Sequence, residues 1–315
     1  MKITVLDRCT VTRGDVPLDE IKTLGDVKFY DIVEPEKIAG VIGDSDAVIC
    51  NKARITDEIM GKCDNLRYIG LFATGYNNID TAAATRRGIT VCNVPGYSTD
   101  SVAQQVFAMI LHFATSADLY SASVLRGDWT RSRTFSYFAY PLTELAGKTL
   151  GIFGFGTIGK KVAAIGMAFG MKIIATSHHP TSYTNVEFVS ADELFARSDY
   201  LTLHCPLTNE TRGIVNSRTL SLMKPTAVLI NTARGGCVEE EALVHALDSG
   251  IIAGAGIDVL DTEPMTKDHP YLKAKNIFIT PHVAWGSYEA RVRLIRLVCD
   301  NVRAFERGEP INKVN

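Results

Sequence analysis

Short apolar runs rich in β-branched residues alternate with segments of helical periodicity through the first hundred residues. Five runs are predicted strands: Lys2–Asp7, Val27–Asp31, Ala47–Asn51, Tyr68–Ala73 and Thr90–Pro95. Three intervening stretches have helical spacing, with Thr56 and Asp80 as N-caps: Glu36–Gly43, Thr56–Cys63 and Asp80–Gly88. Strands that alternate with short helices indicate parallel strands joined by crossovers, with helices on both faces of the sheet.

A long and almost wholly apolar helix is predicted from Asp100, and we expect it to be buried between other elements. After an irregular aromatic segment from Asp128 to Pro141, a second series has six predicted strands: Lys148–Phe153, Met171–Thr176, Asp199–His204, Ala227–Thr232, Gly254–Val259 and Ile277–Thr280. Its predicted helices are Thr157–Gly170, Ala191–Arg197, Ser217–Met223 and Glu239–Ser249, and Ser190 to Glu193 reads as a capping box. Six strands with intervening helices match a complete doubly wound sheet.

A helix rich in Arg and Leu is predicted after Trp285 and runs through Arg303. If it packs on the first domain, the chain crosses twice between two α/β domains. We expect residues 1–99 and 287–315 to form one domain and residues 100–286 the other. Two crossings predict a hinge with a cleft between the domains, which is a common place for a ligand.

Length, composition and charge agree with two ordinary globular domains. The chain has 315 residues, of which 46% are apolar and 22% charged, which excludes collagen-like repeats, low-complexity disorder and a disulfide miniprotein. A net charge of -2 leaves no basic footprint for nucleic acid. The longest apolar stretch, Val106 to Ala114, is interrupted by His112 and is far shorter than the roughly 20 residues of a membrane-spanning helix. No signal-peptide cleavage pattern follows the first strand, and we expect neither nucleic acid nor a membrane as partner.

The seven cysteines are scattered and form no C-x-x-C pair, and no two histidines have zinc-ligand spacing. We therefore expect no metal site. Most of the cysteines lie in apolar runs, where a reduced thiol behaves as a small buried hydrophobe, and this use fits the cytoplasm.

The stretch from Leu150 to Gly159 is the most informative motif in the chain. Gly154, Gly156 and Gly159 occupy the positions of G-x-G-x-x-G, directly after a predicted strand and at the start of a predicted helix. The first glycine allows the tight turn, the second lets backbone approach a pyrophosphate, and the third lets the helix pack on the strand. The N–H groups of Thr157 and Ile158 would face the phosphates. A tight turn in another α/β protein is the alternative, but the βα units downstream favour a dinucleotide site.

The residue that would contact the adenosine ribose is not acidic in this chain. Ser177 lies 18 residues beyond Gly159, close to where a carboxylate normally takes the ribose hydroxyls. A 2′-phosphate becomes tolerable there, and His178 or His179 would contact it when protonated. NAD and NADP both stay open.

Three segments each place one charged or titratable residue just past a predicted strand: Arg234, Glu263 and His282. Ligands of open α/β sheets gather at the carboxyl ends of strands, so the three side chains are expected to converge. Taken singly, each has a structural alternative: a surface ion pair for Arg234, a turn before Pro264 for Glu263, and a core histidine for His282. Together, behind a dinucleotide loop, they favour catalysis.

Reduction of a 2-oxo acid needs such a set. An arginine fork holds the carboxylate and the carbonyl oxygen, and a histidine donates the proton that the oxygen gains. A glutamate on the far ring nitrogen fixes the tautomer and favours the imidazolium. Backbone N–H groups of Ala73, Thr74 and Gly75 would form a nest for the substrate carboxylate, although an ordinary βα turn explains this loop equally well.

On these motifs, together with Asn93 to Gln104 and Pro141 to Leu150, the chain resembles the D-isomer-specific 2-hydroxyacid dehydrogenases over essentially its whole length, and most of all their glycerate dehydrogenase (hydroxypyruvate reductase) members. The fold expected from this resemblance is a Rossmann NAD(P)-binding domain, residues 100–286, inserted in a flavodoxin-like substrate domain. The resemblance implies that Arg234 binds substrate, that His282 is the acid/base and that Glu263 is its partner.

The resemblance also implies the cofactor contacts and a homodimer. Asp258 would hold the nicotinamide carboxamide, and Thr232 and Ala233 would flank the ring. The other implied cofactor residues are Thr157, Ile158, Cys205, Pro206 and Ala284. The helix Val102–Thr115 and the segment around Trp129 would contribute to the dimer interface. The family's usual acidic ribose ligand is replaced by Ser177, which leaves the coenzyme open.

There are two alternatives to the interpretation of this chain as an NAD(P)-dependent reductase of hydroxypyruvate or glyoxylate. One is a binding protein of the same fold that senses NAD(H), since some relatives act as corepressors. The other is a formate- or phosphite-type dehydrogenase; the formate branch generally lacks a carboxylate partner for its histidine, so Glu263 counts against formate but not against phosphite.

Overall fold

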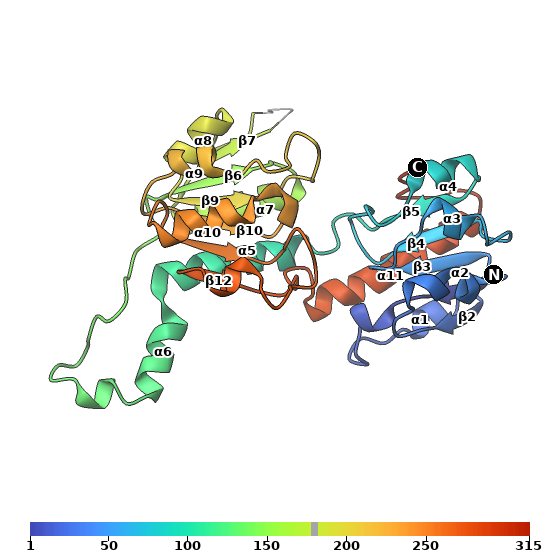
Figure 1. The fold of residues 1–315 in the computed structure, drawn as a ribbon, viewed down its shortest axis with the longest axis horizontal. Coiled ribbons are helices and arrows are strands. Elements are labelled where there is room, and N and C mark those ends of the chain that lie inside the picture. The colour runs from blue at the N-terminus through green and yellow to red at the C-terminus, as the bar shows by residue number, and fades with distance from the viewer. Residues whose placement is uncertain (178–181) are drawn as a thin grey trace. The chain divides into compact units, whose positions relative to one another are not determined.

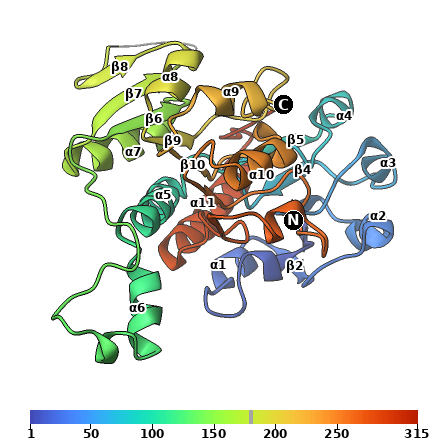
Figure 2. The same ribbon diagram turned by 60° about the vertical axis from the view of Figure 1, so that its left-hand side comes forward.

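The computed structural model describes residues 1–177 and 182–315, which form two compact units (Figure 1). Unit 1 contains Met1–Ser98 and Gly286–Asn315, and unit 2 contains Thr99–Trp285. Each unit has its own parallel sheet with helices on both faces, as the alternation of strands and helices predicted (Figures 1 and 2). Within the described ranges, no helix has the length and apolar character that crossing a membrane would require.

The sheet of unit 1 has the order β2-β1-β3-β4-β5, which is the flavodoxin-like order that was expected. Its strands are β1 (Lys2–Val5), β2 (Asp26–Phe29), β3 (Ala47–Cys50), β4 (Tyr68–Leu71) and β5 (Thr90–Cys92). The inner strands β3 and β4 are buried along their whole length, because helices cover both faces. The chain leaves every strand of this parallel sheet at the same edge, which gathers the following loops there.

The helices of unit 1 are short except the last: α1 (Asp19–Lys22), α2 (Ile38–Ile42), α3 (Asp57–Met60), α4 (Thr81–Arg86) and α11 (Tyr288–Glu306). The predicted N-caps of α3 and α4 are confirmed, since the side chains of Thr56 and Asp80 accept hydrogen bonds from the N–H groups of Ile59 and Ala83. The four-residue α1 was not predicted, because a single turn shows no helical period and its N-cap is Leu18, which supplies no capping side chain of the kind that marks α3.

The sheet of unit 2 has seven strands rather than the six predicted, in the order β12-β11-β10-β9-β6-β7-β8. Its strands are β6 (Thr149–Phe153), β7 (Lys172–Thr176), β8 (Val186–Phe188), β9 (Tyr200–Leu203), β10 (Val228–Asn231), β11 (Gly254–Ile257) and β12 (Ile277–Ile279). Numbered within the unit, this is the doubly wound order 3-2-1-4-5-6 with one further edge strand, β12. The missed strand, β8, is a three-residue edge strand with a glutamate at its centre, so it lacks the apolar run of the inner strands.

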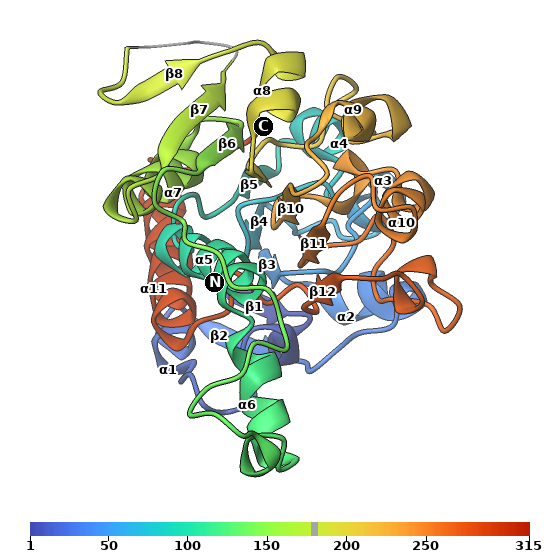
Figure 3. The same cartoon turned by 90° about the vertical axis from the view of Figure 1, so that its left-hand side faces the viewer.

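The helices of unit 2 cover the two faces of its sheet in two groups (Figure 3). One face carries α5 (Thr99–Thr115) and α7 (Thr157–Ala168), and the other carries α8 (Ala191–Arg197), α9 (Ser217–Leu222) and α10 (Glu240–Asp248). The apolar α5 packs on α7, β10 and β11, which confirms its expected burial. Helix α6 (Ala117–Leu125) was not predicted; it starts where Ser116, with φ 49°, ends α5 in a left-handed conformation.

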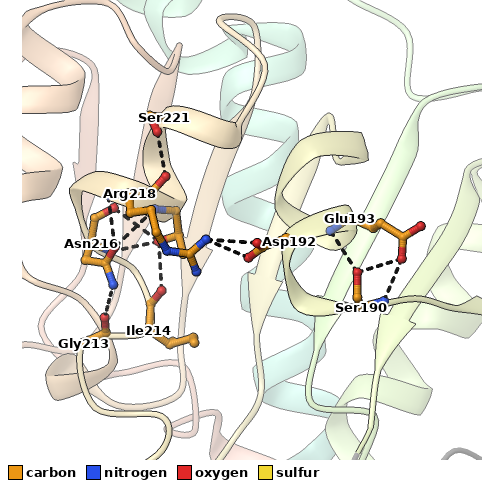
Figure 4. Close-up of polar contacts among 9 residues, drawn as sticks. Ser190, Asp192, Glu193, Gly213, Ile214, Asn216, Arg218 and Ser221 are labelled. Carbon is orange, nitrogen blue, oxygen red and sulfur yellow. Dashed lines mark hydrogen bonds and ion pairs between the residues drawn. The ribbon is translucent and has the colours of Figure 1, made fainter.

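Side-chain caps hold α8 and α9 in place beside the sheet (Figure 4). The predicted capping box of α8 is confirmed, with the Ser190 hydroxyl accepting from the Glu193 N–H and the Glu193 carboxylate accepting from the Ser190 N–H. Asn216 forms a second box at α9, and Arg218 donates to both carboxylate oxygens of Asp192 at 3.0 Å. The segment before α9 is also bonded to the loop after β10, since the N–H groups of Gly213 and Val215 donate to the carbonyl oxygens of Gly236 and Cys237 at 2.9 and 3.0 Å.

Candidate active site

Arg234, Glu263 and His282 lie on the loops that follow three adjacent strands, β10, β11 and β12. These strands pair in parallel, so all three loops leave the same edge of the sheet. Two glycines after Arg234 let the first two loops touch. A Cβ on Gly235 would lie 1.8 Å from the carbonyl carbon of Leu260, and one on Gly236 would lie 2.7 Å from an oxygen of Asp261. Backbone contact between the loops therefore requires glycine at position 235, whereas the atom nearest to a Cβ at position 236 belongs to a side chain.

His282 and Glu263 form a direct pair. The Nδ1 atom of His282 lies 2.7 Å from Oε2 of Glu263, and both side chains are about one third exposed or less (29% and 32%). The other carboxylate oxygen, Oε1, accepts the Leu260 N–H at 3.1 Å. Because Nδ1 is engaged by the carboxylate, Nε2 is the ring nitrogen left for a reacting group.

The backbone of His282 is held in a left-handed conformation by the buried residue Asp258. His282 has φ 56°, and its N–H donates to the Asp258 carbonyl oxygen at 2.7 Å. The Asp258 carboxylate accepts hydrogen bonds from the Thr280 hydroxyl and from the N–H groups of Val283 and Ala284. Burial raises the pKa of Asp258, and these three donors, which favour the carboxylate, oppose that rise. The network fixes the segment that carries the histidine.

The loop that carries Arg234 is shaped by Asn231. The Asn231 side chain accepts the Ala233 N–H at 3.0 Å and donates to the Arg234 carbonyl oxygen at 2.9 Å. The half-buried guanidinium donates to the Ala233 carbonyl oxygen at 2.7 Å, and it forms no ion pair with a carboxylate in the part of the chain that the structure describes. A surface ion pair therefore does not explain Arg234, and its remaining N–H donors are available to an oxyanion.

The glycine turn between β6 and α7 has the shape that a pyrophosphate needs. Gly154 has φ 97°, and a Cβ there would lie 2.8 Å from the Cys205 nitrogen. A Cβ on Gly159 would lie 2.5 Å from the Gly154 oxygen, whereas one on Gly156 would meet nothing within 4 Å. Gly156 is also the N-cap of α7 and supplies no side-chain cap, and the N–H groups of Thr157 and Ile158 in the first turn have no acceptor within the helix.

A second feature that fits a bound dinucleotide is an orphaned polar atom. The Thr232 hydroxyl is buried and has no hydrogen-bond partner in the described chain. Thr232 follows β10, next to Ala233, at the same sheet edge as the glycine turn. A buried hydroxyl without a partner is costly, and a bound ligand that hydrogen-bonds to it removes that cost.

The residues expected around the adenosine follow β7 and β9, the two strands that flank β6. Cys205 directly contacts the Gly154 turn, precedes Pro206, and has its Sγ atom 3.8 Å from that of Cys237. Burial lowers the pKa of the neighbouring His204 to about 3, so this ring is neutral and pairs with the Thr202 hydroxyl. Ser177 follows β7, the neighbour of β6. His178 and His179, the proposed partners of a 2′-phosphate, lie outside the described residues.

In the loop Ala73–Gly75 of unit 1, the first two carbonyl oxygens accept hydrogen bonds, whereas the three N–H groups have no acceptor in the described chain. The Ala73 and Thr74 carbonyl oxygens accept from the Val94 N–H and the Asn93 side chain, at 2.8 and 2.7 Å. The three N–H groups of Ala73, Thr74 and Gly75 donate to no acceptor among residues 1–177 and 182–315. This arrangement leaves them open to an anion.

Several residues that build the site were not anticipated from the sequence. Asn231, Thr280, Glu240 and His269 act through hydrogen bonds to loop backbone or to a site carboxylate. Asn231 stands two residues before the N–H it accepts, which is the spacing of an Asx turn and a usable local signal. The other three contact partners far away in the chain. Among the described residues, no group of three or more His, Cys, Asp and Glu is arranged to hold a metal ion.

Comparison with known proteins places this geometry in a family. The model for the D-isomer specific 2-hydroxyacid dehydrogenase, NAD binding domain, matches residues 107–284. A hydroxypyruvate reductase of Blautia hydrogenotrophica is 40% identical, with 100% of both chains covered.

Two solved structures extend the likeness to three dimensions. An acyclic imino acid reductase in complex with NADPH and D-Arg is 32% identical, with a TM-score of 0.89 and 100% of both chains covered. An NADPH-dependent glyoxylate/hydroxypyruvate reductase of Sinorhizobium meliloti, in complex with NADP and malonate, is 29% identical, with a TM-score of 0.86 and 99% of this chain and 96% of that chain covered. The resemblance drawn from the motifs is thus confirmed, and the chain belongs to the D-isomer specific 2-hydroxyacid dehydrogenase family.

Proposed function

We propose that this protein reduces hydroxypyruvate to D-glycerate, and also reduces glyoxylate, with NAD(P)H as hydride donor. The observation that carries the proposal is the 2.7 Å contact between His282 and Glu263 beside the loop of Arg234. A histidine held by a carboxylate, next to an arginine without an ion-pair partner in the described chain, suits protonation of a carbonyl oxygen beside a carboxylate. The hydroxypyruvate and glyoxylate/hydroxypyruvate reductases among the relatives support this substrate class.

The roles of the three side chains follow from their surroundings. When bound, the nicotinamide coenzyme supplies a hydride to the carbonyl carbon of the substrate. Arg234 would bind the substrate carboxylate and carbonyl oxygen through its planar fork and polarise the C=O bond. His282 would donate the proton on Nε2 to the carbonyl oxygen. Glu263 would hold Nδ1, fix the ring orientation and stabilise the protonated imidazole.

The other expected site residues take positions that support their proposed roles. In unit 2, Gly154, Gly156, Gly159, Thr157 and Ile158 would hold the pyrophosphate, and this unit would be the dinucleotide-binding domain. Around the nicotinamide and the adenosine, the proposed contacts are Thr232, Ala233, Asp258, Ala284, Cys205, Pro206 and Ser177, with His178 outside the described residues. Unit 1 would be the substrate domain, in which the N–H groups of Ala73, Thr74 and Gly75 bind the substrate carboxylate.

We also propose a homodimer in the cytoplasm. Helix α6 and the segment that follows it extend away from the sheet of unit 2 and expose large apolar side chains, with Leu125, Phe135 and Phe138 between 80% and 90% accessible (Figures 1 and 3). Apolar groups so exposed favour a partner surface. Sedimentation of the wild type and of Phe135→Asp tests this, since the variant should sediment as a smaller species. All seven cysteines are free thiols, as the cytoplasm favours.

The deciding experiment is an initial-rate matrix of hydroxypyruvate, glyoxylate, pyruvate and 2-oxoisocaproate against NADH and NADPH. We expect the highest kcat/KM with hydroxypyruvate, then glyoxylate, because a small polar 2-oxo acid suits the substrate class of the relatives. A preference for one of the larger, apolar acids would overturn the assignment of the substrate.

Two further arms separate the alternatives. Oxidation of phosphite or formate by NAD(P)+ without any 2-oxo acid reduction would favour the phosphite- or formate-type dehydrogenase. Binding of NADH, seen as coenzyme fluorescence, without turnover of any substrate would favour a dinucleotide sensor. Pyruvate with methylamine, which presents a C=N bond, tests the chemistry of the related imino acid reductase.

A further inference from the structure

The loop that carries Glu263 is fastened from behind by a residue of α10. One carboxylate oxygen of Glu240, Oε1, accepts the backbone N–H of Asp261 at 3.1 Å. The other, Oε2, lies 3.1 Å from Nε2 of His269. A single carboxylate on the helix thus joins the loop after β11 to a histidine that precedes the short 3-10 turn at Pro270–Leu272.

The surroundings of His269 define the direction of this second contact. The His269 side chain is only 6% exposed, and its Nδ1 accepts the Tyr271 N–H at 3.3 Å. Because Nδ1 is an acceptor, the neutral ring carries its proton on Nε2 and donates it to Glu240. Glu240 therefore receives two hydrogen bonds, one on each oxygen, and only a carboxylate offers both acceptors in this geometry.

The fastened backbone is the same backbone that orients Glu263. Asp261 directly follows Leu260, whose N–H donates to Oε1 of Glu263 at 3.1 Å. The remaining oxygen of Glu263 meets Nδ1 of His282 at 2.7 Å. A movement of residues 260 and 261 would consequently change the angle and distance at which Glu263 reaches the histidine.

A weaker side-chain attachment of this loop comes from Arg212. Arg212 lies 3.5 Å from an oxygen of Asp261, and both side chains are more than half exposed. Exposed pairs of this kind contribute little. Glu240 has a side chain only 21% exposed, so its bonds to the loop and to His269 are better shielded from water.

We propose that Glu240 and His269 are positioning residues for the acid/base step, which hold Glu263 against His282 through the backbone at Asp261. This inference rests on the proposed function, in which His282 donates the proton. The charged groups that face His282 are Glu263, from the loop after β11, and Asp258, from the end of β11. Asp258 is fixed by its own donors, so a loosened loop would reduce the contribution of Glu263 alone.

The test compares Glu240→Ala and Glu240→Gln with Glu241→Ala as the matched control. Glu241 is the next residue of α10 and is exposed, and its side chain has no hydrogen bond or ion pair within the described ranges. For Glu240→Ala we expect kcat/KM for hydroxypyruvate to fall roughly tenfold, since small misplacements in an active site are costly. We also expect the alkaline limb of the pH profile to move to lower pH, because a less well-held carboxylate stabilises the imidazolium less. Glu241→Ala should change neither.

The position of the alkaline limb of the pH profile distinguishes a positioning role of Glu240 from a merely structural one. A loss of activity in Glu240→Ala with the limb unmoved, or the same change in Glu241→Ala, would overturn the inference. If Glu240→Ala does not fold, Glu240→Gln decides the question. Glutamine keeps the shape but offers one acceptor for two donors, so a smaller shift in the same direction is expected, and an unmoved limb contradicts the proposal.

A measurement made without substrate distinguishes the positioning role of Glu240 from the proposed reductase function. In proton NMR spectra of the wild-type protein, the Nδ1 proton of His282 should give a strongly downfield signal where it is shared with the Glu263 carboxylate. This signal should weaken or shift upfield in Glu240→Ala and persist in Glu241→Ala. If the wild type reduced no 2-oxo acid but the signal behaved in this way, the proposed function would fail while the positioning role stood. An unchanged signal in Glu240→Ala would remove the positioning role itself.

Discussion

The two sheets of this protein end in loops of different chemical character. In unit 1, the loops after β3, β4 and β5 are joined to one another by neutral groups, such as the Asn78 and Asn93 amides and the Thr74 hydroxyl, all bonded to backbone carbonyl oxygens. Asp7, which follows β1, is ionisable, and its carboxylate accepts backbone N–H groups of the loop after β3. In unit 2, the loops after β11 and β12 are joined by ionisable groups, with Glu263 on His282 and Asp258 under its backbone. The loops of unit 1 present backbone N–H groups to a ligand. The loops of unit 2 hold the His282 ring so that Nε2 is the nitrogen that carries the reacting proton. Variants in unit 2 should therefore act on kcat, and variants in unit 1 on KM.

The largest effect is expected from His282→Ala, which removes the proposed proton donor. Loss of a general acid typically lowers rates by 10²–10⁴-fold, and we expect kcat for hydroxypyruvate to fall by roughly this factor while NADH still binds. Steady-state rates and coenzyme fluorescence measure the two quantities. His245→Ala, on the exposed face of α10, is the control and should retain the parent rate. Parent-like turnover in His282→Ala would contradict the mechanism.

The next effect is expected from Arg234→Lys. The ammonium keeps the charge but cannot bind a carboxylate and a carbonyl oxygen through one planar fork. We expect kcat/KM to fall roughly 10²-fold, comparable to the loss of one donor from an oxyanion site. Lys148→Arg, at a position just before β6 with no role in the site, controls for a change of cation type. Undiminished affinity and turnover in Arg234→Lys would mean that Arg234 is structural.

Features that depend on near neighbours in the sequence could be predicted in both units. The glycine turn, the caps at Thr56, Asp80 and Ser190, and the strand-end positions of Arg234, Glu263 and His282 depend on neighbours within a few residues, so local patterns reveal them. Strand β8 was missed because it is an edge strand of three residues, and helix α6 was missed because it exposes its apolar side chains. Neither element has a buried face that repeats along the sequence.

Contacts between distant segments were beyond prediction from one sequence. The bond from Glu240 to the Asp261 N–H joins a helix to a loop about twenty residues away, and neither residue type marks it. The same holds for the close approach of Gly235 to Leu260, which depends on the pairing of β10 with β11. Glycine at 235 is visible in the sequence, but the backbone that it must avoid is not.

A smaller effect, on coenzyme choice, is expected from Ser177→Asp. A carboxylate after β7 would repel the 2′-phosphate of NADPH and accept the ribose hydroxyls of NADH. We expect the ratio of kcat/KM for NADH to that for NADPH to rise roughly tenfold, which corresponds to about 1.4 kcal/mol. Ser177→Asn, with the same size but no charge, is the control and should change the ratio less. An unchanged ratio in Ser177→Asp would show that Ser177 does not face the ribose.

The smallest effect is expected in unit 1, from Asn78→Ala. The Asn78 amide donates to the carbonyl oxygens of Asn51 and Ala53, at 3.3 and 2.8 Å, and so ties the loop after β4 to the loop after β3. Each lost hydrogen bond destabilises the native conformation of the loop by about 1 kcal/mol, and no reacting group is removed. We expect KM for hydroxypyruvate to rise roughly threefold with kcat nearly unchanged. Asn77→Ala, at an exposed neighbour with no hydrogen bond in the described chain, should leave both parameters at the parent values. A fall in kcat as large as the fall in kcat/KM expected for Arg234→Lys would show that the loops of unit 1 take part in the chemistry, and the division between the two sheets would then be wrong.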